Sequence, residues 1–145
     1  RLFLGDVSLA RNDLAGAEKN YLDVVRLEPR SAVALNNLAW VTGRLKKDGA
    51  IEYAEKALVL APNQPAFMDT LAMLLSEKGD YDKAFELQTK VMALQPDNPG
   101  FKFNLAKIHI KGGKKDLARK ELDDLAKLGD KFPAQAEVAG LLKSL

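Results

Sequence analysis

The chain has 145 residues, enough for one globular domain, and 47% of them are hydrophobic while 29% are charged, which excludes disorder as the main state. With 22 Lys and Arg against 20 Asp and Glu, the net charge of +2 is too small to argue by itself for nucleic acid or an anionic membrane as the partner. Cys is absent and His occurs once, which excludes disulfides, thiol nucleophiles and Cys-containing metal sites.

The chain begins without Met, and no long apolar run follows. No stretch approaches the 18 or so apolar residues of a membrane span, and no basic and apolar leader precedes the first predicted helix. We therefore expect neither a membrane span nor a signal peptide. The opening Arg1-Leu2-Phe3-Leu4 has no polar lead-in, so we expect the chain to be a piece of a longer protein.

In chain order, apolar residues at helical spacing predict nine helices and no strand. The predicted ranges are 1–10, 14–28, 32–44, 49–60, 66–78, 81–94, 99–112, 115–128 and 134–144. Ser31 is predicted to cap the third helix, and Pro99 stands at a first helical position, where its missing N–H has no cost. Gly79 and the pair Gly112-Gly113 close helices between the members of two predicted hairpins.

A period of 33 or 34 residues organises these helices into pairs. Four columns of the sequence share it: Leu4, Leu38, Leu71 and Leu105; the small residues that follow them, Gly5, Ala39, Ala72 and Ala106; Ala17, Ala50, Ala84 and Ala118; Pro29, Pro62 and Pro96. Such a period predicts stacked supersecondary units. We expect an all-α, right-handed solenoid of about four hairpins, as a single domain over 1–145 with repeats at about 1–31, 32–64, 65–98 and 99–132. Residues 133–145 should form a capping helix in which Ala136, Val138, Ala139, Leu142 and Leu145 cover the last hairpin.

The Gly and Ala residues of these columns let paired helix backbones approach closely, while the Leu residues fill the space between the two helices. We therefore expect Leu38, Leu71, Leu105, Ala50, Ala84 and Ala118 to be buried. Aromatic residues at helical spacing are expected to fill the same seams; they are Tyr21, Tyr53, Phe67, Tyr81, Phe85 and Phe101.

These residues resemble the tetratricopeptide repeat family, whose unit of about 34 residues carries Leu-Gly or Leu-Ala, then Gly-Asp-Tyr, Ala and Pro. The third unit matches most fully, with Leu71-Ala72, Gly79-Asp80-Tyr81, Ala84 and Pro96. The fourth departs most, with Lys115 in the aromatic position and Asp130 where the closing Pro would be. The resemblance covers about residues 1–130 and implies a non-enzymatic scaffold that binds a protein or peptide partner.

A narrower resemblance rests on four short segments. The segments 36–40, 50–58 and 69–72, together with the ending 138–143, are similar to the C-terminal repeats of bacterial TPR lipoproteins of PEP-CTERM/exosortase systems. That resemblance implies a role in exopolysaccharide or protein sorting at the cell envelope, in the periplasm or at the outer membrane. Without it, the cytoplasm is an equally good expectation.

The wider resemblance implies a concave groove lined by the first helix of each pair. The residues at groove positions are Asn36, Asn37, Trp40, Arg44, Asp69, Thr70, Met73, Glu77, Phe103, Asn104, Lys107 and Lys111, and Leu2, Asp6, Leu9 and Val33 extend the row. Amide and hydroxyl side chains can satisfy the backbone of an extended peptide, while Trp and Met offer apolar contact. Trp40 is either an exposed anchor or packs against the shortened turn at 45–49.

Other residues support weaker interpretations. Lys102, Lys107, Lys111, Lys114, Lys115, Arg119 and Lys120 form a basic stretch that could bind an anionic polymer, either nucleic acid or acidic polysaccharide, or could be a solvated face. His109 is expected to be partly buried and hydrogen-bonded rather than a metal ligand or a base. No metal, cofactor or small-molecule substrate is expected. Because no cap precedes the first hairpin, we expect self-association through residues 1–14.

Overall fold

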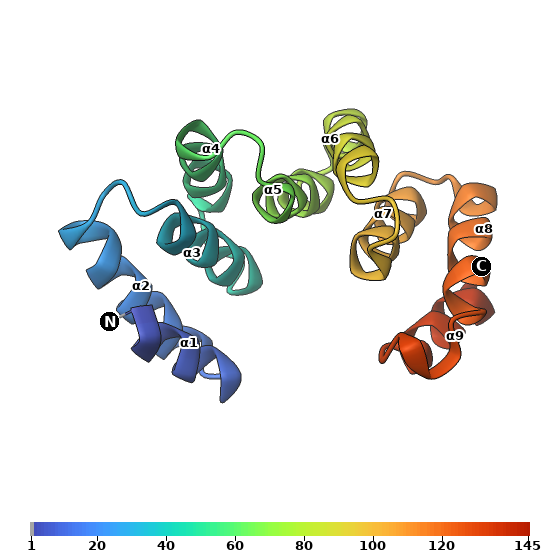
Figure 1. Cartoon of the computed structure of the whole chain (residues 1–145), viewed down its shortest axis with the longest axis horizontal. Coiled ribbons are helices and arrows are strands. Elements are labelled where there is room, and N and C mark those ends of the chain that lie inside the picture. The colour runs from blue at the N-terminus through green and yellow to red at the C-terminus, as the bar shows by residue number, and fades with distance from the viewer. Residues whose placement is uncertain (1) are drawn as a thin grey trace. The chain divides into compact units, whose positions relative to one another are not determined.

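The computed structural model describes residues 2–145, and this part of the chain contains nine α-helices, a 3-10 turn at Gly129–Lys131 and no strand (Figure 1). The helices are α1 Leu2–Ala10, α2 Leu14–Leu27, α3 Ala32–Arg44, α4 Ala50–Leu60, α5 Pro65–Glu77, α6 Tyr81–Leu94, α7 Pro99–Lys111, α8 Lys115–Ala126 and α9 Gln135–Ser144. The predicted all-α class is confirmed, and the predicted ranges agree to within two residues. Arg1, with which the first predicted range begins, lies outside the described residues.

Side chains cap the N-termini of several helices. Asp13 Oδ1 accepts from the Gly16 N–H at 2.9 Å, Ser31 Oγ accepts from Ala34 N–H at 3.3 Å, and Asn98 Oδ1 accepts from Phe101 N–H at 3.1 Å. Each bond satisfies one of the N–H groups that an α-helix leaves unpaired at its start. The predicted Ser31 cap is therefore confirmed.

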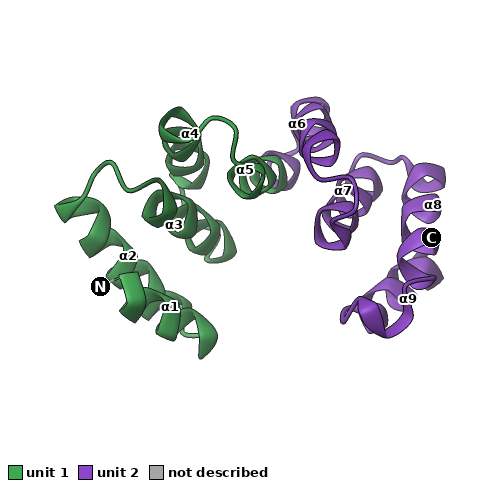
Figure 2. Ribbon diagram, in the orientation of Figure 1, with its two compact units in different colours: residues 1–74 green, residues 75–145 purple. Residues whose placement is uncertain are grey.

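The chain divides into two compact units, residues 1–74 and residues 75–145, and the division falls inside α5 (Figure 2). In unit 1, α1 pairs with α2, and α3 packs on both α2 and α4. In unit 2, α7 packs on α6 and α8, and α9 packs on α8. Within unit 1, α1 and α3 lie on one side and α2 and α4 on the other, and within unit 2, α7 and α9 lie opposite α6 and α8 (Figure 2).

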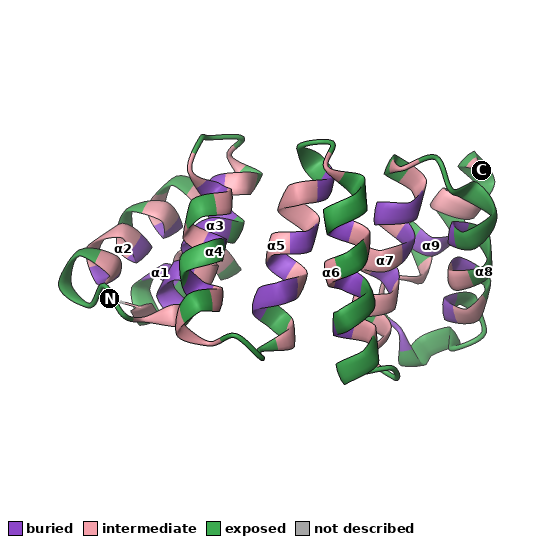
Figure 3. Cartoon of the chain, turned by 90° about the horizontal axis from the view of Figure 1, so that it is seen from above, coloured by how far each residue is buried: buried purple, intermediate pink, exposed green. Residues whose placement is uncertain are grey.

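The core of unit 1 holds two clusters. In one, Leu38 and Val41 of α3 pack against Ala17 and Tyr21 of α2, all of them buried. In the other, Leu35, Ala57 and Phe67 join α3, α4 and α5. In α2, α4, α6 and α8 the buried residues recur every three or four positions along one side of the helix (Figure 3), which is the periodicity from which these helices were predicted.

The core of unit 2 extends into the C-terminal helix. Phe103 of α7 and Phe132 stack edge to face with centroids 5.5 Å apart, and Val138 of α9 is buried in the same cluster. Leu142 and Leu145 pack against it, as predicted for a capping helix. Ala136 and Ala139 are exposed instead, so the cap covers the hairpin with one face only.

The predicted buried columns are confirmed at four positions and wrong at two. Leu38, Ala50, Ala84 and Ala118 are buried, whereas Leu71 and Leu105 are only half-buried. Leu38 packs beside the large Tyr21. The repeat positions that correspond to Tyr21 hold Ala54 in the next unit and Gln88 in the one after it, and these residues are smaller or polar. Less apolar surface is therefore available to cover the later two leucines. The seam aromatics divide in the same way: Tyr21 and Phe67 are buried, but Tyr81 is exposed.

Candidate functional site

Unit 1 presents an exposed aromatic and cationic pair on α3. Trp40 is 39% exposed, and the Arg44 guanidinium lies over its ring at 4.9 Å from the centroid. The four-residue spacing puts both side chains on one helix face. Trp40 is therefore accessible to solvent and is not enclosed by the turn at 45–49. A stacked guanidinium holds the indole in one orientation, which lowers the entropy that a contact with a partner would cost.

Three polar groups meet beside this pair. The Tyr21 hydroxyl donates to Asp6 Oδ1 at 2.5 Å, and the Asn37 side chain hydrogen-bonds to the same hydroxyl. Burial raises the pKa of Tyr21, and the hydrogen bond and negative charge of Asp6 raise it further, whereas the Asn37 bond lowers it. Tyr21 thus reaches from α2 between α1 and α3 and fixes the Asp6 and Asn37 side chains with its oxygen.

Gly5 makes room for this arrangement. A Cβ on Gly5 would lie 2.4 Å from Tyr21 Cε1, closer than any real contact, and Tyr21 is fully buried. The sequence indicated a seam role for Tyr21 but not its hydrogen bonds. A signal was available, because Phe would fill an apolar seam equally well and only Tyr brings a hydroxyl.

The other predicted groove residues of unit 1 differ in accessibility. Thr70 is buried and its Oγ1 donates to the Ala66 carbonyl at 3.1 Å, so its side chain does not face an open surface, contrary to expectation. A hydroxyl inside a helix commonly donates a hydrogen bond to a backbone carbonyl of the preceding turn in this way. Asn36, Asp69 and Met73 are half-buried.

In unit 2 the predicted groove residues form charged pairs. Lys107 Nζ lies 3.8 Å from Glu137 and 4.2 Å from the Phe103 centroid, while Lys111 Nζ lies 3.3 Å from Glu77. In both ion pairs the carboxylate is the more exposed partner. Asn104 is half-buried.

Phe103 was predicted to face the groove, and that expectation is wrong. The ring is 6% exposed because it packs on Phe132 in the core, with Lys107 above it. Its helical position was predicted correctly, but the capping helix α9 and Phe132 cover a face that an open groove would have left exposed.

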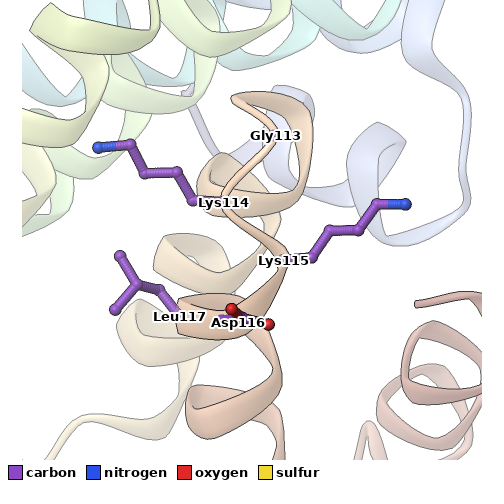
Figure 4. A pocket seen from close by; sticks show the side chains of 5 residues that line it. All are labelled: Gly113, Lys114, Lys115, Asp116 and Leu117. Atoms are coloured by element: carbon purple, nitrogen blue, oxygen red, sulfur yellow. The ribbon is translucent and has the colours of Figure 1, made fainter.

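The basic stretch separates into two groups. Lys102, Lys107 and Lys111 have acidic partners, and the pair of Lys102 with Asp124 measures 3.7 Å. In the described part of the chain, no carboxylate lies within ion-pair distance of Lys114, Lys115, Arg119 or Lys120. Lys114 and Lys115 point to opposite sides of the turn that starts α8 (Figure 4), beside a shallow pocket of about 290 Å³.

His109 is buried, and its Nδ1 lies 2.6 Å from Glu121 Oε1, which confirms the expected hydrogen-bonded histidine. Because a carboxylate only accepts, the Nδ1 carries the proton of that bond. The ring also contacts Phe85, with centroids 4.9 Å apart. Among the residues that the structure describes, no three His, Asp or Glu side chains group as metal ligands would, and no helix has the length and apolar character needed to cross a membrane.

Comparison with known proteins supports a repeat protein. Residues 75–145 match the tetratricopeptide repeat family. No curated protein sequence matches the chain. Among solved structures, a thermophilic TPR protein of Thermus thermophilus matches with a TM-score of 0.81 and 18% identity, over 97% of this chain and 79% of the other.

Two further structures are similar. MamA matches with a TM-score of 0.71 and 19% identity, over 97% of this chain and 83% of its own. The pilF protein of Pseudomonas aeruginosa matches with a TM-score of 0.77 and 23% identity, over 99% of this chain and 66% of its own. At these identities the likeness concerns the fold alone. The match over residues 75–145 and the fold of the whole chain together support the tetratricopeptide repeat family for this protein.

Proposed function

We propose that this chain is a non-enzymatic scaffold that binds a peptide segment or a partner protein through the helix face of unit 1 that carries Asp6, Asn37 and Trp40, and that the face of unit 2 with Lys107 and Lys111 is a separate candidate surface. The tetratricopeptide repeat fold is itself suggestive of a protein-interaction scaffold. One observation carries the choice of surface: Trp40 is exposed and oriented by Arg44, beside an acceptor and an amide that Tyr21 holds in place.

The chemistry of unit 1 suits a polypeptide ligand. Asp6 has a second carboxylate oxygen, and Asn37 has both amide donors and an acceptor, so the two can bond to backbone or side-chain groups. Trp40 supplies a large apolar contact that loses little rotamer freedom, and Trp is enriched among residues that dominate binding energy. A rigid aromatic residue beside prepositioned polar groups is the arrangement that protein interfaces favour.

The face of unit 2 would contribute charge. The ion pairs Lys107 with Glu137 and Lys111 with Glu77 are partly exposed, so each stabilises the fold only slightly. A partner that brings its own charges can exchange with either member at little energetic cost. We expect these pairs to select partners and to speed their approach more than to add affinity.

The proposal is tested by affinity capture with the full chain and two variants. Trp40→Ala removes the aromatic contact, and Tyr81→Ala removes an aromatic residue of the same 39% exposure on α6. We expect Trp40→Ala to lose at least tenfold of the captured partner relative to Tyr81→Ala, as quantitative mass spectrometry would measure. Equal capture by the two variants would remove Trp40 from the site.

A second candidate function is binding of an anionic polymer through α8. The observation in its favour is the set of cations that have no acidic partner among the described residues, Lys114, Lys115, Arg119 and Lys120, of which Lys114 lies over the Phe85 ring at 5.3 Å from the centroid. The ion pairs of Lys102, Lys107 and Lys111 support ranking this function second. Binding of single-stranded DNA or heparin that weakens steeply with salt, and that Lys115→Glu abolishes, would favour this function.

Two other proposals concern location and self-association. The narrower sequence resemblance supports a place at the bacterial cell envelope, which fractionation of cells that express the tagged protein would test. The exposed Phe3 and Leu4 of α1, at 74% and 52%, support self-association through the N-terminal edge.

A further inference from the structure

A groove on the outer side of unit 1 has no role in the proposed function. It has a volume of about 450 Å³ and is lined by Pro29, Leu35, Glu52, Glu55, Lys56, Val59 and Leu60. Its floor is apolar and continues into the core, since Leu35 belongs to the cluster that joins α3, α4 and α5. Glu52, Glu55, Lys56 and Val59 are all exposed on one face of α4.

Val59 is unusual for this surface. It is 81% exposed, the largest exposure among the exposed large hydrophobic residues of the described chain. The corresponding positions of α2, α6 and α8 carry Arg26, Ala93 and Lys127, so only α4 places a large apolar side chain here. The repeat architecture therefore does not require Val59, and contact with another surface would explain it.

The rim of the groove is acidic. In the described residues, no cation lies within ion-pair distance of Glu52 or Glu55, and Lys56 is the one basic residue of the lining. An occupant with complementary chemistry would bring an apolar side chain for the floor and cations for these two carboxylates.

Such a surface exists on α8 of the same chain. Leu117 is 45% exposed, and Lys120 stands three residues after it on the same helix face, while Lys114 is the residue directly before α8. Figure 4 shows Lys114 and Leu117 on the same side of the turn. Neither lysine has an acidic partner within ion-pair distance among the described residues.

We propose that the α4 groove of one copy binds the start of α8 of a second copy, with Leu117 against Val59 and the groove floor and with Lys114 and Lys120 facing Glu52 and Glu55. The two surfaces differ, so the contact is heterologous. Each copy keeps one free groove and one free α8 surface, and copies therefore add head to tail into rings or open chains. Exposed charges drive the approach, so the association weakens as salt shortens the reach of their attraction.

Sedimentation velocity of the full chain at several concentrations and two salt concentrations tests this contact. The groove variant Glu52→Lys with Glu55→Lys and the α8 variant Lys114→Glu with Lys120→Glu each break one side. A control variant, Asp97→Lys with Asp130→Lys, makes the same charge change as the groove variant at exposed positions outside both surfaces. Circular dichroism confirms that each variant folds.

The expected result is a sedimentation coefficient that rises with concentration at low salt for the wild type and the control, and that stays constant for either variant alone. Mixing the two variants restores both contacts, because the native α8 surface of one variant faces the native groove of the other and the reversed groove faces the reversed α8 surface, so the mixture associates and grows although neither variant does so alone. The chain with all four reversals regains association.

Three results would overturn the proposal. The first is a wild-type coefficient that does not change with concentration at low salt. The second is association that survives Glu52→Lys with Glu55→Lys, which would assign the α8 cations to another partner such as an anionic polymer. The third is complete loss of association in Phe3→Ser with Leu4→Ser, rather than the partial reduction expected if the N-terminal edge forms a second contact, because complete loss would place the whole contact at that edge. None of these results depends on Trp40, so the proposed function is tested separately.

Discussion

Gly5→Ala tests whether Tyr21 is held as tightly as the structure indicates. The added Cβ would lie 2.4, 2.6 and 2.9 Å from three ring atoms of the fully buried Tyr21, so either the ring or α1 must shift to admit it. Overpacking of this kind costs about 1 to 3 kcal/mol. Ala is a better helix former than Gly by about 1 kcal/mol, which offsets part of that cost. We therefore expect a net loss of up to about 2 kcal/mol in the free energy of unfolding.

Two comparisons separate the clash from the helix propensity. Gly140 lies in α9 with nothing within 4 Å of an added Cβ, so Gly140→Ala should stabilise by about 0.5 to 1 kcal/mol. In a Tyr21→Val background the three clashing ring atoms are gone, and Gly5→Ala should then stabilise as well. Urea unfolding followed by far-ultraviolet circular dichroism gives the free energies, provided that the slope with denaturant is unchanged. A Gly5→Ala variant as stable as Gly140→Ala would refute the packing of Tyr21 on α1.

Three further predictions concern single features. Tyr21→Phe should keep the fold but lower stability by about 1 kcal/mol at neutral pH, through loss of the bond to Asp6. Because the folded-state pKa of Tyr21 is raised, the wild type should lose stability as the pH rises above about 10, and Tyr21→Phe should lack that loss, in urea titrations at pH 8 to 11. Ala84→Leu should overpack a fully buried site and cost about 1 to 3 kcal/mol; an unchanged unfolding midpoint would contradict this. Phe3→Ser with Leu4→Ser should lower the average mass that light scattering measures, because it removes the apolar contact at the N-terminal edge. An equal average mass for the wild type and this variant would exclude that edge.

The helices were predictable because their signals are local. Ser31 and Pro99 mark helix starts by side-chain chemistry that needs no partner from elsewhere in the chain. The repeat period added the pairing of helices, since equivalent residues must meet equivalent neighbours. Burial was predicted less well. Leu71 and Leu105 share a column with the buried Leu38, but their exposure depends on what the neighbouring helix supplies at Ala54 and Gln88.

The candidate site was predictable in position but not in detail. Trp40 was correctly identified as a residue that can face solvent, because its place in the repeat indicates a helix face. Phe103 occupies a similar place but is covered by Phe132 and α9, which belong to the irregular end of the chain and have no counterpart in earlier repeats. The bond between Tyr21 and Asp6 joins side chains 15 residues apart on different helices, and its geometry depends on tertiary packing that no local pattern carries.

Site-specific photo-crosslinking tests the proposed interaction face most directly. A photoreactive residue is introduced at Asn37, on the face of α3 that carries Trp40, or at Lys90, which is exposed on α6. Cells that express the protein are irradiated, and crosslinked products are identified by mass spectrometry. The proposed function predicts that a defined partner protein is captured from position 37 and not from position 90. Capture from position 90 alone, or equal capture from both positions, would contradict it.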